Sequence, residues 1–369
     1  MGESRGDGPV GGPGGRIDVD RPVLVVLRAL GLGDLLVAVP ALRGLRAGFP
    51  HHRIVLAAPE GLAPLVGAID AVDDRVHCAG PEDTALAERL RGAGLWPVDT
   101  AVNLHGDGEA SRGLLVGLEP RTYIGEPVGG AGGAPRDSAL HQRERWVALL
   151  REHGLPGDPT DVRIGSPRGA GRIVERALRA ADAPFPETCG AHPFALVHVG
   201  AKFGSRHWPV ERFGAVTAGL VRQGLRVLVT GNQVERPRTA ATVRAAQELL
   251  SGGAAEGEEV VDLGGRLGLE ELCACVAGSA LVVSVDTGVA HLASAYGRPS
   301  VVLFGPVGPE LWGPPPGPHR VLTDVSVRRG DVRATDPDPA LLAVTAADVL
   351  AEARALLQPR APAAGGSRH

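Results

Sequence analysis

The sequence predicts an α/β protein of two similar halves, each with a parallel sheet covered by helices, facing each other across a cleft. Short β-branched apolar segments alternate with segments whose apolar residues recur at helical spacing. This alternation runs twice along the 369 residues, and the Pro- and Gly-rich stretch 154–171 separates the two runs. Alternating strands and helices imply parallel strands, because the chain must cross a sheet face between successive strands.

The first half is expected to fold from Arg21 onward, as a domain over residues 21–170. Residues 1–20 hold Gly, Pro and charge without an apolar period, so we expect a disordered arm there. Strands are expected over residues 22–28, 53–57, 75–78, 100–104 and 121–124. Helices are expected over residues 35–47, 62–69, 83–92, 110–118 and 140–152.

The second half repeats the alternation, as a domain over residues 171–339. Strands are expected over residues 195–199, 226–230, 259–262, 281–285 and 300–304. Helices are expected over residues 210–223, 235–250, 269–277 and 289–296. A last helix, 340–358, is expected to pack across both domains before a disordered tail, 359–369.

Composition excludes several classes of protein. The net charge of −4 without a basic tract argues against nucleic acid as a partner. We see no apolar stretch near the roughly 20 residues that span a bilayer, and no signal peptide. The cysteines lie in unrelated segments and are expected to be reduced: Cys78, Cys189, Cys273 and Cys275. A cytoplasmic protein is expected, with peripheral contact at the inner face of the membrane left open.

The most informative motif is the junction after the expected strand 281–285. Asp286, Thr287 and Gly288 follow this apolar run directly and supply helix-cap chemistry. A helix start presents free N–H groups and the positive end of its dipole, so a diphosphate can sit against Thr287, Gly288 and Val289. The alternative is that Asp286 caps a purely structural helix.

A second junction, Gly31-x-Gly33-Asp34, follows the first expected strand. Its glycines let the backbone approach a ligand, and Asp34 projects a carboxylate from the helix start. The pattern lacks the third glycine of a dinucleotide fingerprint, which argues against a nicotinamide oxidoreductase. Asp34 is alternatively a first-turn acid that favours the helix dipole.

The loop 200–209 is basic and lies at the end of another expected strand. Arg206 or Lys202 is suited to face a second side of the same diphosphate, since guanidinium groups contact phosphate oxygens in pairs. The alternative is a solvated basic loop in which Trp208 anchors the core.

A further strand end carries Glu235. Its carboxylate is suited to accept hydrogen bonds from the hydroxyls of a ribose, as acidic residues do in nucleotide sites. It is equally suited to be an acid at a helix N-terminus.

Together these motifs resemble glycosyltransferase family 9, the ADP-heptose:lipopolysaccharide heptosyltransferases and their relatives. The resemblance runs from about Val23 to Ala355. It is carried by Ser284-Val-Asp286-Thr287-Gly288-x-x-His291, the loop from Lys202 that ends in His207-Trp208-Pro209, Gly31-x-Gly33-Asp34 before Pro40-Ala-Leu, and Phe304-Gly305-Pro306. It implies GT-B architecture, in which two Rossmann-like domains hold the acceptor (N-terminal) and the nucleotide-sugar donor (C-terminal).

The resemblance also implies roles for individual residues. Asp34 becomes the general base, which deprotonates an acceptor hydroxyl as it attacks the anomeric carbon, so the sugar inverts. We expect this carboxylate to be partly desolvated when the domains close. The donor-binding residues become Lys202, Ser205, Arg206, Glu235, Asp286, Thr287, Gly288 and His291. Fixed donors at the helix start and Arg206 can hold the leaving diphosphate, so no metal or other cofactor is expected.

On the acceptor side the resemblance implies Gly33, Asn103, His105 and Arg145. Asn103-Leu-His105-Gly106 is similar to a family segment that begins with an acid, which Asn103 replaces. The segment His141-Gln-Arg-Glu-Arg145 resembles the helix that directs basic residues at an anionic acceptor. Arg145 is alternatively a solvated helix residue.

The sequence therefore predicts an inverting glycosyltransferase, which is expected to be a monomer. Its donor is a nucleotide-diphosphate sugar such as ADP-heptose, and its acceptor a cell-envelope glycan, a lipid-linked saccharide or a small molecule. Two further alternatives are a GT-B-type nucleotide-sugar epimerase and a non-catalytic sugar-nucleotide-binding protein. The sequence leaves the sugar and the acceptor open.

Overall fold

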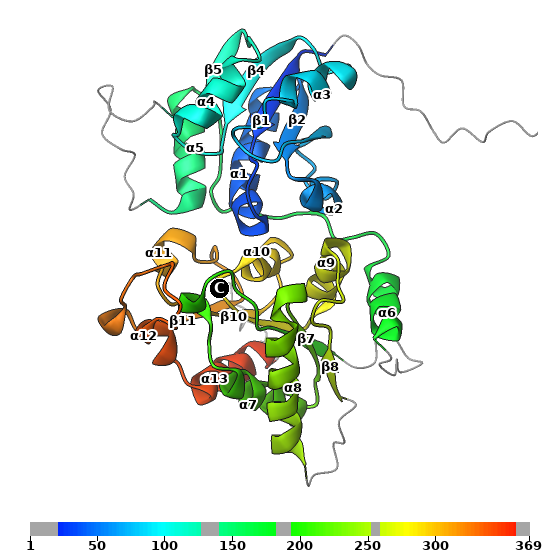
Figure 1. Cartoon of the computed structure of the whole chain (residues 1–369), viewed down its shortest axis with the longest axis vertical. Helices are drawn as coiled ribbons and strands as arrows, with labels where there is room; N and C mark the ends of the chain where they lie inside the picture. Colours follow the sequence, from blue (N-terminus) through cyan, green and yellow to red (C-terminus); the bar gives the residue numbers. More distant parts are fainter. Residues whose placement is uncertain (1–20, 127–139, 182–192, 252–258, 359–369) are drawn as a thin grey trace, which may run out of the picture.

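The computed structural model describes residues 21–126, 140–181, 193–251 and 259–358. It has two lobes, one above the other in Figure 1, each built on a parallel sheet. The sheet of the first lobe has the strand order β3-β2-β1-β4-β5, and that of the second has β11-β10-β9-β6-β7-β8. The arm predicted for residues 1–20 and the tail predicted for 359–369 lie outside the described residues.

The first lobe surrounds β1, whose residues are buried on both faces as a central parallel strand requires. Its strands are β1 (Val23–Leu27), β2 (Arg53–Ala58), β3 (Asp74–His77), β4 (Val98–Asn103) and β5 (Thr122–Ile124). Its helices are α1 (Leu32–Gly48), α2 (Ala63–Val66), α3 (Leu86–Gly92), α4 (Glu109–Val116) and α5 (Gln142–Glu152). Helices α1, α2 and α5 cover one sheet face, while α3 and α4 cover the other.

The second lobe is built in the same way around β6 and β9. Its strands are β6 (Phe194–His198), β7 (Arg226–Thr230), β8 (Val260–Asp262), β9 (Leu281–Val285), β10 (Ser300–Leu303) and β11 (His319–Leu322). Its helices are α6 (Ala170–Ala180), α7 (Val210–Val221), α8 (Arg236–Leu250), α9 (Leu269–Gly278), α10 (Gly288–Ala295), α11 (Pro309–Trp312), α12 (Pro339–Leu342) and α13 (Ala346–Leu357). Among the helices described, none is both long and apolar enough to cross a membrane.

The topology positions the site. In each sheet the chain order reverses beside a central strand, between β1 and β4 and between β6 and β9. Ligands of open parallel sheets bind outside the carboxyl ends of the strands at such switch points. Helices α1 and α10, which begin just after β1 and β9, pack against each other across the lobe boundary.

The connection between the lobes runs along both of them. The N–H of Gly165 bonds to the carbonyl of Ala68 in the first lobe, and the N–H of Ile164 bonds to that of Ala295 in the second. Helix α6, which the sequence analysis did not predict, packs on α9 of the second lobe. Its buried residues Ile173, Val174, Ala177 and Leu178 recur at helical spacing.

The C-terminal segment corrects a prediction. Residues 340–358 were expected to form one helix across both domains, but they form α12 and α13, and Thr345 caps α13. Helix α13 packs on α7 and on β9, β10 and β11, on the side of the second lobe that faces away from the first (Figure 1). The cause is its apolar face, whose Val349 and Ala353 belong to the core of that lobe.

Candidate functional site

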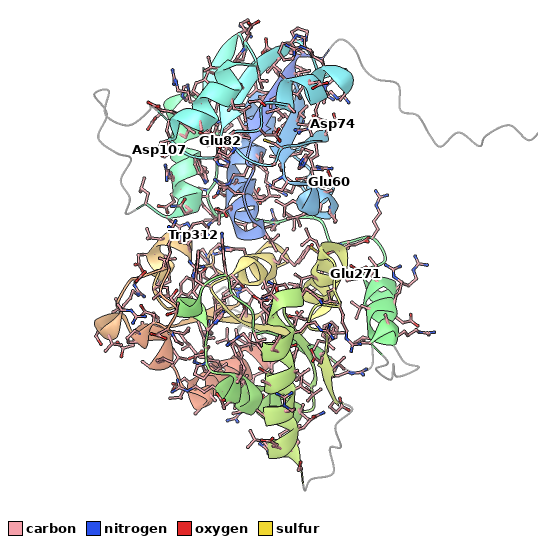
Figure 2. All side chains as sticks on the ribbon, in the orientation of Figure 1. Glu60, Asp74, Glu82, Asp107, Glu271 and Trp312 are labelled. Carbon is pink, nitrogen blue, oxygen red and sulfur yellow. The ribbon has the colours of Figure 1, made fainter. Side chains whose placement is uncertain are left out.

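A cavity of about 600 Å³ lies between the two lobes. The first lobe contributes the turn from Gly31 to Asp34, and the second contributes residues that follow β6, β7 and β9, together with Trp312 of α11. Figure 2 shows Trp312 at the level where the lobes meet. Nine of the thirteen predicted site residues line this cavity, and the other four are Ser205, Asn103, His105 and Arg145.

The start of α10 forms one wall. Thr287 is the N-cap residue, and the first turn contains no acidic residue. Within the described part of the chain we find no acceptor for the N–H groups of Thr287, Gly288 and Val289. Three unpaired N–H groups and the positive end of the helix dipole therefore face a cavity, which is the arrangement that binds an anion.

Arg206 and Asp286 form a pair beside this helix start. Nη1 of Arg206 donates to the carbonyl oxygen of Asp286 at 3.0 Å and lies 3.2 Å from its carboxylate oxygen Oδ2. Burial raises the pKa of Asp286 to about 6, and the Arg206 guanidinium opposes this rise. Asp286 thus holds Arg206 against the cavity, instead of exposing its own carboxylate to an anion.

His291 lies on the first turns of α10, below the same wall. Its Nε2 is 3.9 Å from Oδ1 of Asp286, too long for a hydrogen bond. Burial lowers the pKa of His291 to about 3, helped by Arg143, His141 and Arg206. The imidazole is therefore neutral at pH 7. Its ring meets the Trp312 ring edge to face, with centroids 5.9 Å apart.

Asp34 stands opposite, at the start of α1, with 34% of its side chain exposed. Arg28, the residue after β1, lies underneath and is buried. Its Nε donates to the Asp34 carbonyl at 2.9 Å, its Nη2 lies 3.4 Å from Oδ1 of Asp34, and its Nη1 donates to the Leu104 carbonyl. Burial lowers the pKa of Arg28 to about 10, so it stays charged at neutral pH. These contacts hold the carboxylate at the cavity edge.

Glu235 is an acid at a helix start that also faces the cavity. Its Oε2 accepts from the Asn232 N–H at 2.7 Å in a capping box, so it is a helix-start acid. It also lines the cavity, as does the half-buried His198. A Cβ on Gly200 would come within 1.9 Å of Oε2, so only glycine allows the carboxylate this position. Burial lowers the pKa of His198 to about 4.

The loop 200–209 divides its residues between the cavity and the core. Lys202 is exposed and lines the cavity. Trp208 is buried in the core, as expected for a loop that Trp208 anchors. The prediction for Ser205 is wrong in this geometry: its side chain is buried, and Oγ donates to the carbonyl of Val332 at 2.6 Å. The hydroxyl of Ser205 is therefore engaged in a hydrogen bond to the backbone of a segment far along the chain.

The predicted acceptor residues mostly lie elsewhere, with Gly33 as the exception that lines the cavity. Asn103 is buried: its Nδ2 donates to Ser111 Oγ at 3.0 Å, and its Oδ1 accepts from the N–H of His105. Its amide therefore closes the turn after β4, which corrects the binding role. His105 is half-buried and is not among the residues that line the cavity, and burial and nearby Arg28 lower its pKa.

Arg145 requires a similar correction. Its Nε donates to Oε1 of Glu126 at 2.8 Å and its Nη2 pairs with Oε2, while the Glu126 side chain is buried. The guanidinium also lies over the Trp146 ring, 5.1 Å from its centroid. Glu126 thus occupies the guanidinium N–H groups of Arg145 that a bidentate contact with an anion would use.

Among the residues at the site that the sequence analysis missed are Arg28, His198 and Trp312. The first two end strands that point into the cleft, so their positions carried a signal. The position of Trp312 was difficult to predict, because it belongs to a helix of four residues, which is too short to show an apolar period.

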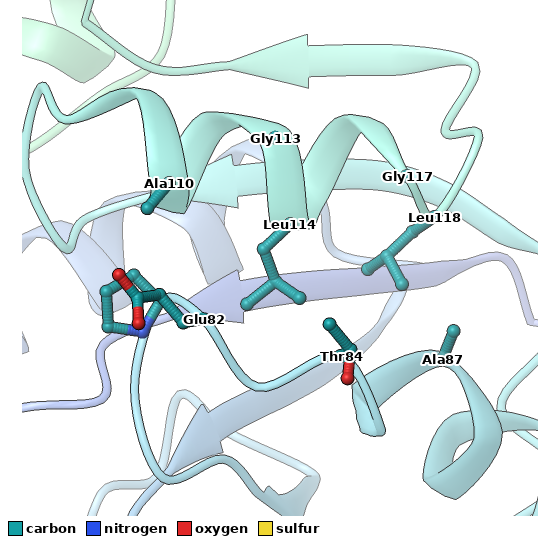
Figure 3. Close-up of a pocket in the computed structure, with 9 residues that line it drawn as sticks. Glu82, Thr84, Ala87, Ala110, Gly113, Leu114, Gly117 and Leu118 are labelled. Atoms are coloured by element: carbon teal, nitrogen blue, oxygen red, sulfur yellow. The ribbon is translucent and has the colours of Figure 1, made fainter.

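A second cavity, of about 420 Å³, lies on the first lobe between α4 and the segment from Pro81 to Ala87 (Figure 3). Leu114 and Leu118 point into it, and it contains none of the predicted site residues. Within the described ranges, no group of three or more His, Cys, Asp or Glu side chains is placed to hold a metal ion.

Two parallel-sheet lobes that face each other across a cleft are the GT-B architecture, in which ligands bind outside the carboxyl ends of the strands. Residues 134–326, more than half of the chain, match the profile of glycosyltransferase family 9 (heptosyltransferase). The chain belongs to this family and is a glycosyltransferase.

Similarity to individual proteins agrees with this membership. Lipopolysaccharide heptosyltransferase 2 of Escherichia coli K12 is 29% identical over 90% of this chain and 98% of its own length. Lipopolysaccharide heptosyltransferase 1 of Salmonella typhimurium is 36% identical over 33% of this chain and 35% of its own length. The solved structure of E. coli ADP-heptose LPS heptosyltransferase II has a TM-score of 0.70 at 20% identity, and covers 91% of this chain and 98% of that chain.

Proposed function

We propose that this protein transfers a heptose, or a closely related sugar, from a nucleotide-diphosphate donor such as ADP-heptose to a hydroxyl of a cell-envelope glycan. One observation carries the proposal: a single cavity brings the Asp34 carboxylate of one lobe opposite the unpaired N–H groups at Thr287, Gly288 and Val289 of the other. Its volume of about 600 Å³ falls in the range of small-molecule sites. The heptosyltransferase names of the full-length relatives support the choice of sugar.

On the donor side, the start of α10 and Arg206 bind the diphosphate. Charge builds up on the diphosphate as the bond to the sugar breaks, and donors that are already in place stabilise it without reorganisation. Neutral His291 supplies a further N–H group rather than a charge. Glu235, held by its capping box, receives the ribose hydroxyls.

On the acceptor side, Asp34 acts as general base. It removes the proton of the acceptor hydroxyl while that oxygen forms a bond to the anomeric carbon, and the electron pair of the breaking bond leaves with the diphosphate on the opposite face. This single displacement inverts the sugar. A covalent intermediate would need a second carboxylate as nucleophile, whereas here the other cavity carboxylates are engaged with Arg206 and with Asn232.

The proposed reaction uses no metal or organic cofactor, because N–H groups and a guanidinium neutralise the leaving group. We propose further that the enzyme is a cytoplasmic monomer, with peripheral contact to the membrane when the acceptor is lipid-linked. The free, buried thiols of Cys78, Cys273 and Cys275 suit a reducing compartment.

The test is product analysis with purified protein and a panel of nucleotide sugars. We expect ADP-heptose to raise the melting temperature with its concentration, and to give a glycosylated product with inverted anomeric configuration when an acceptor is present. A free sugar or an epimer formed from donor alone would instead identify an epimerase. Binding without turnover for any acceptor would identify a non-catalytic sensor.

A further inference from the structure

At the start of helix α5 in the first lobe, the half-buried His141 and the buried Arg143 reach across the lobe boundary. His141 Nε2 lies 3.0 Å, and Arg143 Nη1 2.7 Å, from the same acceptor: the backbone carbonyl oxygen of Gly313, in the second lobe. Two side chains from one lobe thus bind both lone pairs of one carbonyl in the other. Arg143 Nε donates to the carbonyl oxygen of Pro159, and this bond fixes the orientation of the guanidinium group.

The protonation states of the pair follow from its partners. Nδ1 of His141 accepts from the backbone N–H of Arg143, so Nε2 carries the proton that is donated to Gly313. Burial and the neighbouring Arg143 lower the pKa of His141 to about 4, so this neutral tautomer persists at pH 7. Burial lowers the pKa of Arg143 to about 10, and it remains a cation.

The carbonyl that receives both donors belongs to the residue directly after Trp312. Trp312 lines the donor cavity, and its ring meets that of His291. Gly313 itself lacks room for a side chain, since a Cβ would come within 2.4 Å of the Pro309 carbonyl oxygen. The short helix α11 is therefore tightly folded, and movement of the Gly313 carbonyl carries the Trp312 ring with it.

The charge of Arg143 also reaches the cavity. We find no carboxylate in an ion pair with its guanidinium among the described residues. Its charge nevertheless contributes to the lowered pKa of His291, which lines the cavity. This charge therefore helps to keep the His291 ring, which meets Trp312, in its neutral form.

We propose that His141 and Arg143 are positioning residues for the donor: they hold Trp312 as a wall of the donor cavity when the lobes are closed, and so couple lobe closure to donor binding. This assignment differs from the acceptor contact implied for their helix. It rests on the proposed function only in taking the occupant of the cavity to be a nucleotide-diphosphate sugar.

The first experiment measures donor kinetics and ADP titration in Arg143→Ala, Arg143→Lys and Trp312→Ala. Because a charge-assisted hydrogen bond is lost, we expect Arg143→Ala to raise the donor KM and the Kd for ADP about 10- to 100-fold, with kcat at saturating donor changed less than about 3-fold. Arg143→Lys should recover part of the affinity, since an ammonium group restores a charged donor to the Gly313 carbonyl. Arg151→Ala is the matched control, because Arg151 lies on the same helix and bonds to the Gly157 carbonyl at the surface.

The second experiment asks whether Arg143 acts through Trp312. If it does, the double variant Arg143→Ala/Trp312→Ala binds ADP no more weakly than Trp312→Ala alone. Effects that multiply, or an unchanged Kd in Arg143→Ala, would overturn the proposal. Small-angle scattering of the free protein gives a readout that needs no sugar transfer: loss of the clamp should increase the radius of gyration. An unchanged radius together with unchanged ADP affinity would also refute it. Failure of the proposed function would appear differently, as a wild-type protein that transfers no sugar.

Discussion

Helices α1 and α10 both begin just after a central strand of their sheet, and their first turns approach each other across the cleft. A Cβ on Gly33 of the first would lie 3.0 Å from the His291 ring of the second, and one on Gly288 would lie 2.9 Å from Leu32. The two starts differ in charge. Helix α1 carries Asp34 in its first turn, whereas the first turn of α10 carries no acid.

This difference assigns the two starts to different tasks. In α1 the carboxylate of Asp34 already compensates the positive end of the helix dipole, so this end attracts an external anion only weakly. In α10 the acid precedes the helix and is paired with Arg206, so the N–H groups stay available. In the proposed mechanism the same strand–turn–helix element thus supplies a base in one lobe and an anion site in the other, and the position of one acid decides which.

The largest expected effect separates chemistry from binding. Asp34→Asn keeps the shape of the α1 start but removes the base, so kcat should fall by about 10²- to 10⁴-fold while the Kd for ADP stays within about 2-fold. Steady-state kinetics and titration measure the two quantities. Asp107→Asn, an exposed acid on the same lobe, is the control. Normal turnover in Asp34→Asn would remove the base assignment.

A smaller effect is expected at the other helix start. Arg206→Ala removes a charged donor and leaves Asp286 buried without its partner, so donor affinity should fall about 10- to 100-fold. Arg206→Lys should retain most of the affinity, and Lys202→Ala should have a weaker effect because Lys202 is exposed. Titration with ADP measures the change. A Kd in Arg206→Ala equal to that of wild type would contradict the phosphate role.

The third prediction concerns stability and its dependence on pH. Burial lowers the pKa values of His198, His291 and His319 in the second lobe to about 4, 3 and 4. The folded lobe therefore binds fewer protons than the unfolded chain between about pH 4 and 6.5, and its free energy of unfolding should fall as pH falls through this window. Each histidine contributes about 1.4 kcal/mol per pH unit. Asp286, with its raised pKa, opposes this as a single group below about pH 6.

Urea unfolding at a series of pH values tests this prediction. His198→Gln should flatten the profile, because it removes one of the histidines that must stay neutral. A free energy of unfolding that does not change between pH 6.5 and 4.5 would contradict the neutral state of the three rings.

Much of the fold was predictable from local pattern. The strands predicted over 226–230 and 281–285 coincide with β7 and β9, because buried parallel strands are short β-branched runs between turn residues. Helix α6 was missed, since the Pro- and Gly-rich stretch before it hid an apolar spacing that was present. Strand β11 is an edge strand without a fully buried residue, so its sequence shows no continuous apolar run.

The site likewise contains residues whose positions were predictable from local pattern and residues whose partners were not. Asp34 and the Asp286–Gly288 turn follow apolar strands directly, so their place at the strand ends could be predicted. The roles expected for Ser205, Asn103 and Arg145 are corrected, because their side chains are engaged by Val332, Ser111 and Glu126 from other segments of the chain. Spacing along the chain contains no information about which distant polar group will satisfy a side chain.

The sequence by itself determined where strands turn into helices, and therefore which residues stand at the carboxyl ends of two parallel sheets. These are consequences of local apolar period and of glycine and cap residues, which act within a few positions of the chain. Only the tertiary structure decided which of those residues remain available to a ligand and which are taken up by a partner, and it alone joined His141 and Arg143 to Gly313. Hydrogen bonds and burial between distant segments exist only after the lobes have packed.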